Sequence, residues 1–263
     1  MRLSAAGPDA GSVGPARRNL RAAFRGSLPS PQWPASSPAQ VVIALFQTSD
    51  WEPWLADASA LLGAADLARA QRQRNAHKRE ELTLAYALHR LLLGARMGVD
   101  PVVVPLARDA LGCPRLQDAP FHTSLSHSGG WVAAAVTGAG PVGVDIEPES
   151  RRSVMAGIAA RVCHPAEAIA LAGLAPAQYN HALLELWVRK EALLKAAGVG
   201  MAREMDTFMA PDDSLQALCQ AEPAMTHVQM LPLGPDVIGA VAAPPGAVVE
   251  SVWLRPSPAA GGG

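Results

Sequence analysis

The order of the predicted elements constrains this chain most, because helices followed by strands occur twice along it. Apolar residues recur at helical spacing over about residues 78–97 and again over about 178–197, and Gly98 and Gly198 end these two segments. Shorter helical stretches precede each long segment, and short β-type segments separated by turns follow it. This repeated order predicts an α+β protein made of two similar halves.

The strands of the two halves can be placed from their apolar runs and the turns between them. In the first half they are expected at 41–46, 102–106, 123–126, 131–136 and 142–146, and the last three should form a small antiparallel meander. In the second half they are expected at 207–209, 214–219, 226–231, 237–241 and 248–254. Residues 41–148 are therefore predicted to be the N-terminal half and residues 149–255 the C-terminal half.

The two ends of the chain differ in composition from the part between them. Residues 1–40 are rich in proline and arginine and contain one acidic residue, Asp9, so we expect a disordered or non-native N-terminal extension. Residues 256–263 end in glycines and are expected to be a flexible tail. Because no apolar run is long enough for a signal peptide or a transmembrane helix, we expect a cytoplasmic protein that does not enter a membrane.

Composition argues against two classes of protein. Of the 263 residues 49% are hydrophobic, and 22 basic residues against 23 acidic ones give a net charge of −1. A disordered chain would have few apolar residues and a high net charge, and general nucleic-acid binding would need a basic surface. The cysteines, Cys113, Cys163 and Cys219, have no metal-binding spacing and are expected to be reduced thiols.

One predicted strand ends in two carboxylates. In the run Gly143-Val144-Asp145-Ile146-Glu147 side chains alternate between faces, so Asp145 and Glu147 should point the same way about 7 Å apart. Two carboxylates at a strand end suit Mg2+, which takes one or two protein carboxylates together with substrate phosphates and water. Taken alone, the pair also fits an ordinary strand with its polar residues outward.

The second long helical segment carries a group of charged residues. Trp187, Glu191 and Lys195 are spaced by four residues and form one stripe on a helix. Arginine dominates the basic residues elsewhere, yet two of the few lysines, Lys190 and Lys195, stand here. Lysine is a flexible point charge that suits a phosphate oxygen. Taken alone the pattern fits an ordinary surface Glu–Lys pair, and the use of lysine here is the observation that stands against that interpretation.

A polar segment precedes both of these motifs. Ser126, His127 and Ser128 stand at the end of a predicted strand, directly before two glycines. Their hydroxyls and imidazole are suited to hydrogen-bond an anion. No Gly-x-Ser-x-Gly turn surrounds the serines, so a Ser–His nucleophile is not favoured, and a polar turn without function is the alternative.

Together and in this order the three motifs resemble the 4′-phosphopantetheinyl transferases. Ser-His-Ser is followed along the chain by Gly-x-Asp-x-Glu and then by Trp-x-x-Lys-Glu-x-x-x-Lys. The resemblance covers roughly residues 66–209. The length is similar to that of the larger, monomeric type, represented by the surfactin-synthetase transferase Sfp, and not to the small trimeric carrier-protein synthases.

The resemblance implies a fold, a reaction and a set of partners. Two similar α+β halves, a pseudo-dimeric arrangement, would bind coenzyme A as co-substrate in the cleft between them, with Mg2+ as cofactor. The implied reaction transfers the 4′-phosphopantetheine group of coenzyme A to a serine of an acyl or peptidyl carrier protein and releases 3′,5′-ADP. The partners would therefore be coenzyme A and a carrier protein, with no nucleic acid and no membrane.

The motif positions also imply the site residues. Asp145, Glu147 and Glu191 match the residues that hold Mg2+ together with the pyrophosphate. Lys195 would face that pyrophosphate, and Glu191 would take the proton of the carrier serine. The implied catalytic residues are thus Asp145, Glu191 and Lys195.

The implied nucleotide-binding residues come mostly from the first half. His127 would contact the 3′-phosphate, and Ser126 would help to position the nucleotide. Arg69 and Arg72 are candidates for the same phosphate. Arg151, Arg152 and Arg161 follow the carboxylate strand and are candidates for docking an acidic carrier protein.

Two positions depart from the family pattern. Members often carry a Gly-Lys-Pro turn near the adenine, where this chain has Gly112-Cys113-Pro114. Gly112 and Pro114 should keep the turn at the nucleotide, but the cysteine puts one cationic contact in doubt. Ser124 holds the place of an asparagine that is common before Ser-His.

Two rival functions remain beside this one. A catalytically inactive module that binds coenzyme A or a carrier protein would normally have lost one of the metal-binding carboxylates, and here all are present. Another Mg2+-dependent phosphate-transfer enzyme could carry the same spacing by independent origin.

Overall fold

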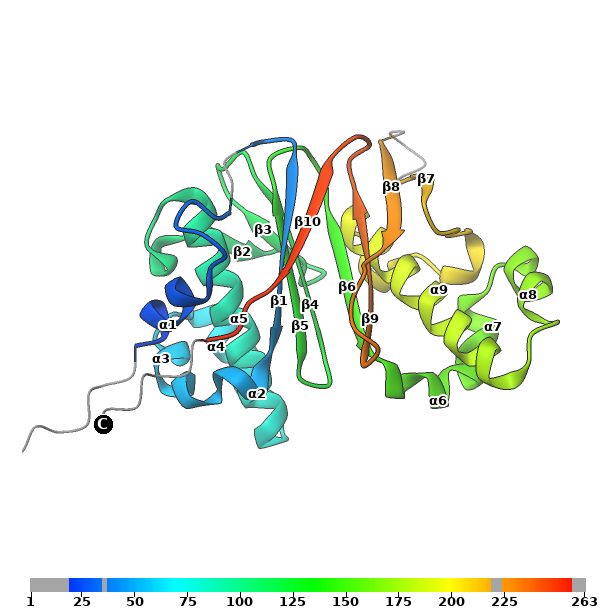
Figure 1. Ribbon diagram of the computed structural model, residues 1–263, viewed down its shortest axis with the longest axis horizontal. Helices are drawn as coiled ribbons and strands as arrows, with labels where there is room; N and C mark the ends of the chain where they lie inside the picture. The colour runs from blue at the N-terminus through cyan, green and yellow to red at the C-terminus, as the bar shows by residue number, and fades with distance from the viewer. Residues whose placement is uncertain (1–18, 35–36, 219–223, 257–263) are drawn as a thin grey trace, which may run out of the picture.

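A computed structural model describes residues 19–34, 37–218 and 224–256 of the chain. Two four-stranded sheets lie face to face in the middle, with helices covering the outer face of each (Figure 1). The first sheet has the order β10-β1-β5-β4 and consists of β1 (Gln40–Gln47), β4 (His122–Ser128), β5 (Trp131–Thr137) and β10 (Val248–Trp253). The second has the order β6-β9-β8-β7 and consists of β6 (Gly143–Pro148), β7 (Ser214–Ala217), β8 (Met225–Met230) and β9 (Val237–Ala243).

Two long helices dominate the outer layers, and both were predicted. They are α5 (Ala76–Met97) on the first sheet and α9 (Pro176–Ala197) on the second, and each ends at a glycine with φ 67°. The shorter helices are α1 (Leu20–Ser27), α2 (Thr48–Trp51), α3 (Leu55–Ser59), α4 (Ala64–Gln71), α6 (Arg152–Met155), α7 (Ala159–Val162) and α8 (Pro165–Leu171). Single 3-10 turns are η1 (Glu52–Trp54), η2 (Pro101–Val103), η3 (Glu149–Arg151), η4 (Ala156–Ile158), η5 (Gly200–Ala202) and η6 (Met205–Thr207).

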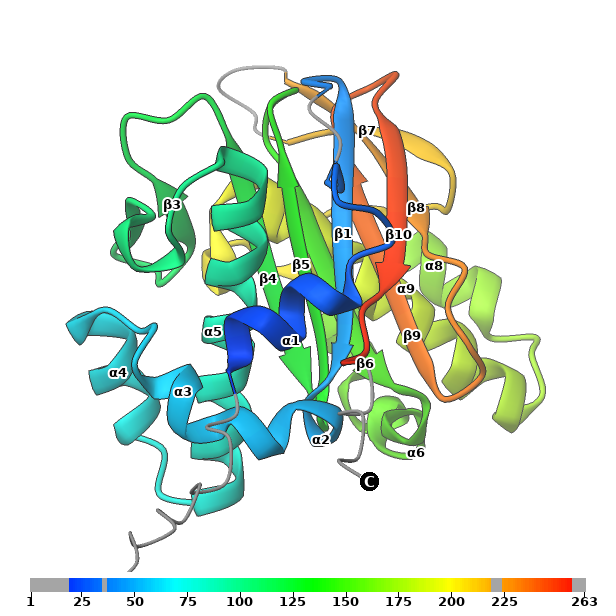
Figure 2. The same ribbon diagram turned by 60° about the vertical axis from the view of Figure 1, so that its left-hand side comes forward.

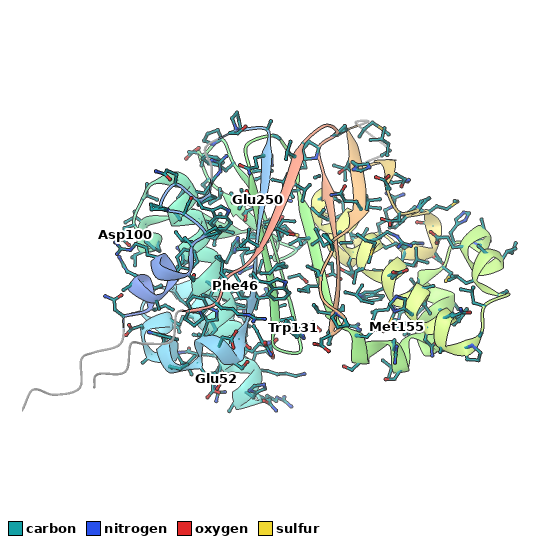
Figure 3. The ribbon with its side chains drawn as sticks, viewed as in Figure 1. Phe46, Glu52, Asp100, Trp131, Met155 and Glu250 are labelled. Atoms are coloured by element: carbon teal, nitrogen blue, oxygen red, sulfur yellow. The ribbon has the colours of Figure 1, made fainter. Side chains whose placement is uncertain are left out.

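Strand β1 is buried on both faces and therefore contributes to two hydrophobic cores. Its even-numbered residues, such as Phe46, pack under α5, and its odd-numbered residues, such as Ile43, pack against the second sheet. A third core lies under α9 and contains Met155. Figure 3 shows Phe46 and Met155 on opposite sides of the paired sheets. The α+β fold class predicted from the sequence is confirmed, with the layer order helix, sheet, sheet, helix.

The two sheets do not follow the predicted division of the chain strictly. Strand β6, which ends the predicted N-terminal half 41–148, pairs with β9 of the second sheet and not with β5, so the expected meander reduces to the β4–β5 hairpin. Strand β10, which ends the predicted half 149–255, runs parallel to β1 in the first sheet. Each half thus gives one strand to the other sheet. The boundary at residue 148 stays a prediction for the division of the chain, and it does not coincide with the division into two sheets.

Two predicted strands are wrong. Residues 102–106 and 207–209 are apolar enough for strands, but η2 takes the first two positions of the former and η6 the first position of the latter. Residues 104–105 and 208–209 belong to neither a helix nor a strand. A short β2–β3 hairpin, β2 (Leu106–Arg108) and β3 (Pro114–Leu116), follows the first of them. The other predicted strands correspond to observed ones within a few residues, although position 219 of the predicted strand 214–219 lies outside the described residues.

Part of the segment predicted as an N-terminal extension belongs to the fold. Within residues 1–40, helix α1 buries Leu20 and Phe24 in the core under α5, and Figure 2 shows it lying in front of α5. Trp33 is also buried, and its Nε1 donates to Glu250 Oε1 on β10 at 3.2 Å. The four-residue spacing of Leu20 and Phe24 was a signal for this helix that the proline-rich surroundings concealed. The predicted tail 256–263 lies almost wholly outside the described residues.

Helix α9 and strand β6 touch backbone to backbone. A Cβ atom on Gly143 would lie 1.9 Å from the carbonyl oxygen of Ala192 and 2.4 Å from the amide nitrogen of Ala196. Only glycine permits this approach, which brings the face of α9 that carries Glu191 and Lys195 down to β6. In the described part of the chain no helix is long and apolar enough to cross a membrane.

A buried histidine under the first sheet predicts an acid-sensitive stability. His89 Nε2 lies 2.7 Å from Thr123 Oγ1, and because that hydroxyl donates to the carbonyl of Ala135, the Nε2 of His89 must carry its hydrogen. Its Nδ1 is buried without a hydrogen-bond partner. Burial, with the charges of Arg108 and Arg90, lowers the pKa of His89 from 6.5 to about 3.

The unfolded chain takes up this proton at a higher pH than the folded protein does. The stability contributed by neutral His89 is therefore fully present above pH 6.5 and is lost as the pH falls towards 3. We expect the free energy of unfolding, measured with urea, to fall by up to about 1.4 kcal/mol per pH unit in this window from His89 alone. His89→Gln should flatten that slope, and an unchanged slope in this variant would contradict the assignment.

Candidate active site

Three alternate serines of β4 connect the two sheets. Strands β4 and β6 run side by side, and Ser124 Oγ accepts a hydrogen bond from the amide of Val144 at 3.1 Å. Ser126 Oγ donates to Asp145 Oδ1 at 2.7 Å, and Ser128 Oγ donates to Glu147 Oε2 at 2.5 Å. Side chains at every second position thus replace the backbone ladder that would join two strands of one sheet.

Lys195 adds a contact from the facing helix. Its Nζ donates to Asp145 Oδ1 at 2.6 Å and to Ser126 Oγ at 2.7 Å. The hydroxyl of Ser126 therefore donates one hydrogen bond to Asp145 and accepts from Lys195, with a further long contact from the amide of Ile146 at 3.4 Å. Strands β4 and β6 and helix α9 meet at this junction, where the carboxylate of Asp145 is 5% exposed.

Glu147 lies on the same face of β6 as Asp145, as the alternation predicts, but it has a different cation. Arg151 Nη1 donates to Glu147 Oε1, and the Arg151 guanidinium lies over the ring of Trp187 at 4.9 Å. Arg151 was expected among the carrier-docking residues. Its contacts with Glu147 and Trp187 place it beside the carboxylates, with 33% of its side chain exposed.

Burial and mutual repulsion dominate the electrostatics of the carboxylates. Burial and the charge of Asp145 raise the pKa of Glu191 to about 7, opposed by Lys195, while Glu147 adds a smaller upward push. Burial and Asp145 also raise the pKa of Glu147, opposed by Ser128 and Arg151. Negative charge is thus crowded here beyond what the neighbouring cations balance.

The donor set suits a hard divalent cation, although no preformed metal cage is present. Among the described residues no group of three or more His, Cys, Asp or Glu side chains is arranged to hold a metal ion. In the described ranges the Oδ2 atom of Asp145 is nevertheless buried without a hydrogen-bond partner, and burial together with neighbouring carboxylates raises the pKa of Glu191 and of Glu147. Carboxylate oxygens of this kind fit Mg2+, which completes its shell with phosphate and water.

A cavity of about 220 Å³ opens beside this junction. Its lining comes from the first sheet and its helices, from the β2–β3 hairpin and from α9. Cations are prominent in it, namely Arg69, Arg108, Arg115 and Lys195, with His127 and Glu191. A cavity lined by several cations next to buried carboxylates suits a ligand that carries several phosphates.

Most of the predicted site residues lie at this cavity. Arg69, Gly112, His127, Glu191 and Lys195 line it. Asp145 and Glu147 lie at the junction behind it, as the contacts of Asp145 with Lys195 show.

Two predicted nucleotide-binding residues are placed elsewhere. Arg72 is exposed at the end of α4 and does not line the cavity. Ser126 does not line it either, because its hydroxyl is taken up by Asp145 and Lys195. Ser126 thus fixes the carboxylate strand.

The two motif lysines have opposite surroundings. Lys195 faces the cavity with 24% of its side chain exposed, whereas the side chain of Lys190 is fully buried. Lys190 Nζ donates to the carbonyls of Val162, Met205 and Phe208 at 2.6–2.7 Å and pairs with Glu167 at 2.6 Å. The expectation that both lysines serve a phosphate is therefore corrected for Lys190, which anchors the core under α9.

Sequence reasoning missed two arginines of the cavity. Arg108 Nε donates to Asp66 Oδ1 at 2.8 Å, and its guanidinium lies 4.2 Å from the ring centre of Tyr86. Arg115 Nε donates to Asp109 Oδ2 at 3.0 Å. Both arginines flank the Gly-Cys-Pro turn in the sequence, and this clustering could have indicated them. At this turn the sequence-based expectation concerned only the absent lysine of the family pattern.

A second cavity, of about 330 Å³, adjoins the carboxylates on another side. Arg151 and Trp187 line it together with α7 and η6. Trp187 Nε1 and Asp206 Oδ1 are buried there without hydrogen-bond partners, one a donor and the other an acceptor. The cavity therefore offers both kinds of polar contact to a ligand with amide groups.

The cysteines take no part in a disulfide among the described residues. Cys163 is buried and Cys113 is half-buried at the cavity, both as free thiols. Cys219 lies outside the described residues.

Comparison with known proteins shows which protein family the chain resembles. The sequence model of the 4′-phosphopantetheinyl transferase superfamily matches residues 141–241. The 4′-phosphopantetheinyl transferase HetI of Nostoc sp. is 30% identical over 185 residues, which are 69% of this chain and 78% of the relative. A 4′-phosphopantetheinyl transferase of Bacillus subtilis is 31% identical over 160 residues, covering 56% of this chain and 70% of the relative. The transferase Sfp of Bacillus subtilis is 28% identical over 126 residues, covering 48% and 55%.

The chain therefore belongs to the 4′-phosphopantetheinyl transferase superfamily. Its enzyme class is that of the named relatives, a 4′-phosphopantetheinyl transferase. The matched segment 141–241 includes the carboxylate strand β6 and the helix α9 that carries Glu191 and Lys195.

Proposed function

We propose that this protein transfers the 4′-phosphopantetheine group of coenzyme A to a serine of an acyl or peptidyl carrier protein, with Mg2+ as cofactor and 3′,5′-ADP as leaving group. The observation that carries the proposal is the junction of β4, β6 and α9. There Asp145, Glu147 and Glu191 crowd negative charge beside Lys195, at the edge of a cavity lined by arginines. Membership of the transferase superfamily supplies the reaction class.

Asp145, Glu147 and Glu191 are the residues that would hold Mg2+. Their oxygen donors suit this ion, and the fact that they form no complete cage fits a site finished by the phosphates of the substrate. When bound, the ion would act as a Lewis acid on the pyrophosphate and neutralise charge that develops during transfer. It would also relieve the repulsion that raises the pKa of Glu191.

In this proposal the two ends of coenzyme A would occupy the two cavities. The nucleotide end of coenzyme A carries the phosphates and suits the arginine-lined cavity of about 220 Å³. The pantetheine arm contains two amides and suits the second cavity, where Trp187 Nε1 and Asp206 Oδ1 lack partners. The pyrophosphate between the two ends then lies at the carboxylates and Lys195.

The chain's own residues have distinct tasks in the reaction. Lys195 leaves part of its pairing with Asp145 to hold a pyrophosphate oxygen, where it stabilises charge on the leaving 3′,5′-ADP. Glu191 lines the cavity and would take the proton of the carrier serine as its oxygen attacks the pantetheine-side phosphorus. Phosphoryl transfer of this kind depends on positioning and charge neutralisation and needs no covalent enzyme intermediate.

The remaining sequence-based expectations belong to the same proposal. The protein would act as a monomer in the cytoplasm, in two halves divided near residue 148. Arg152 and Arg161 remain candidates for docking an acidic carrier protein, since Arg152 keeps 53% of its side chain exposed.

Mass spectrometry of the carrier protein tests the proposal. Incubating the full chain with an apo-carrier, coenzyme A and Mg2+ should add about 340 Da to the carrier, the mass of one phosphopantetheine group. A carrier with its acceptor serine replaced by alanine should gain nothing, and chelation of the metal should stop the reaction. An inactive binding module would bind coenzyme A with no gain in mass, and another phosphate-transfer enzyme would leave the carrier unchanged; either result would overturn the proposal.

A further inference from the structure

Arg115 on the β2–β3 hairpin is held in place by one of its nitrogens and leaves the others open. Its Nε donates to Asp109 Oδ2 at 3.0 Å, and Asp109 Oδ1 in turn accepts the amides of Leu111 and Cys113. Within the described residues Nη1 and Nη2 of Arg115 have no hydrogen-bond partner, and 47% of the side chain is exposed. The guanidinium is therefore oriented by the hairpin but still able to bind a ligand.

The other half of the molecule also shapes the position of this guanidinium. A Cβ atom on Gly198, the residue that ends α9, would lie 1.9 Å from Arg115 Nη2. Arg115 thus rests on bare backbone at the end of α9, where the partial negative charge of the helix terminus favours a cation. Gly198 is needed both for its φ of 67° and for this contact.

Arg115 and Cys113 belong to the same wall of the arginine-lined cavity. Both residues line it, Arg115 from β3 and Cys113 from the position just before that strand. Arg108 and Lys195 line the same cavity. Burial and the charge of Asp109 raise the pKa of the Cys113 thiol, opposed by the charges of Arg115, Lys195 and Arg108. Arg115 thus brings a positive charge to the cavity wall where the family pattern has a lysine and this chain has Cys113.

We propose that Arg115 is a substrate-binding residue, whose Nη1 and Nη2 take a phosphate group at the nucleotide end of coenzyme A, and that Gly198 leaves the space it needs. A planar fork that already has one nitrogen bound to a carboxylate suits two oxygens of one phosphate. The inference rests on the proposed function, because it takes coenzyme A as the ligand of this cavity.

Calorimetric binding of nucleotides to the intact chain tests the contact. Arg115→Ala should weaken the binding of 3′,5′-ADP about tenfold, the lower end for a hydrogen bond to a charged group, because Arg115 is half exposed. Binding of adenosine should be unchanged. Arg74→Ala, which removes an exposed arginine that does not line the cavity, is the matched control and should have no effect.

A third nucleotide, 5′-AMP, identifies the phosphate concerned. A loss confined to 3′,5′-ADP assigns the contact to the 3′-phosphate, and an equal loss for 5′-AMP assigns it to the 5′-phosphate end. Unchanged binding of 3′,5′-ADP, or an equal loss for adenosine, overturns the inference. Arg115→Gln, which removes the charge but keeps most of the side-chain length, replaces Arg115→Ala should the latter unfold at lower urea.

A charge transplant provides the sharper control. Because Cys113 and Arg115 both line the cavity, Cys113→Lys should restore most of the affinity for 3′,5′-ADP when it is added to Arg115→Ala. No recovery would mean that Arg115 does not act as a cation on this wall, which overturns the proposal. The transfer assay separates the role of Arg115 from the proposed function. If the wild-type protein modifies the carrier and Arg115→Ala binds 3′,5′-ADP normally, only the role of Arg115 is refuted. A wild-type protein that neither binds 3′,5′-ADP nor transfers refutes both.

Discussion

Replacing Asp145 or Glu191 by alanine is expected to lower pantetheine transfer at least about a thousandfold while the protein stays folded. Asp145 links β6 to Ser126 and Lys195, and its Oδ2 has no partner in the part of the chain that the structure describes, so one oxygen is left for a cation. Glu191 approaches the same point from α9. The rate is to be measured as mass gain of the carrier protein with saturating Mg2+ and coenzyme A.

Replacing Glu191 should remove activity without lowering stability. The pKa of Glu191 is raised chiefly by burial and by Asp145, so its ionised form is disfavoured in the folded protein, and Glu191→Gln should unfold at the same or a higher urea concentration. Glu185→Ala on the same helix, which only breaks a pair with His181, is the control for α9 and should keep full activity. Full transfer by Asp145→Ala or Glu191→Ala would refute the assignment of the carboxylates.

The sequence was sufficient for the parts of the site that depend on local geometry. The alternation along β6 correctly places Asp145 and Glu147 on one face, and the four-residue spacing on α9 turns Glu191 and Lys195 towards them. The same geometry was available for Lys190. With 3.6 residues per turn it lies about 100° from Glu191 and about 140° from Lys195 around the helix, so it cannot share their face.

The sheet pairing and the cavity wall could not be predicted in the same way. Strand β10 pairs in parallel with β1 although some two hundred residues separate them in sequence, and such a pairing leaves no mark on either strand alone. The contact of Arg115 with Gly198 likewise depends on how the hairpin packs on the end of α9. A glycine after a long helix predicts a helix cap. That the same glycine also leaves space for the Arg115 guanidinium follows only from the packing.

Lys190→Met is expected to lower the free energy of unfolding by about 3–5 kcal/mol, the cost of removing one partner of a buried ion pair. The side chain is fully buried, and its Nζ is the donor for three carbonyls that belong to α7, η6 and the segment after η6. Without Lys190 those carbonyls lose their donor. The negative charge of Glu167, whose side chain is only 12% exposed, loses its cation. Urea unfolding at neutral pH measures the loss.

Variants of Lys190 and of its partner Glu167 distinguish this structural role from a contact of Lys190 with phosphate. Methionine is close to lysine in length, so Lys190→Met leaves little empty space, and Lys78→Met at an exposed site of α5 is the matched control with an expected change under about 0.5 kcal/mol. Adding Glu167→Gln should recover part of the loss, because the uncompensated charge then disappears while a side-chain oxygen remains to accept one of the two backbone amides that bind Glu167. A Lys190→Met protein of wild-type stability that binds 3′,5′-ADP poorly would instead return Lys190 to the substrate. The bonds of Lys190 to three carbonyls and Glu167 argue against that outcome, since a lysine with all its donors engaged in the core has none left for a phosphate.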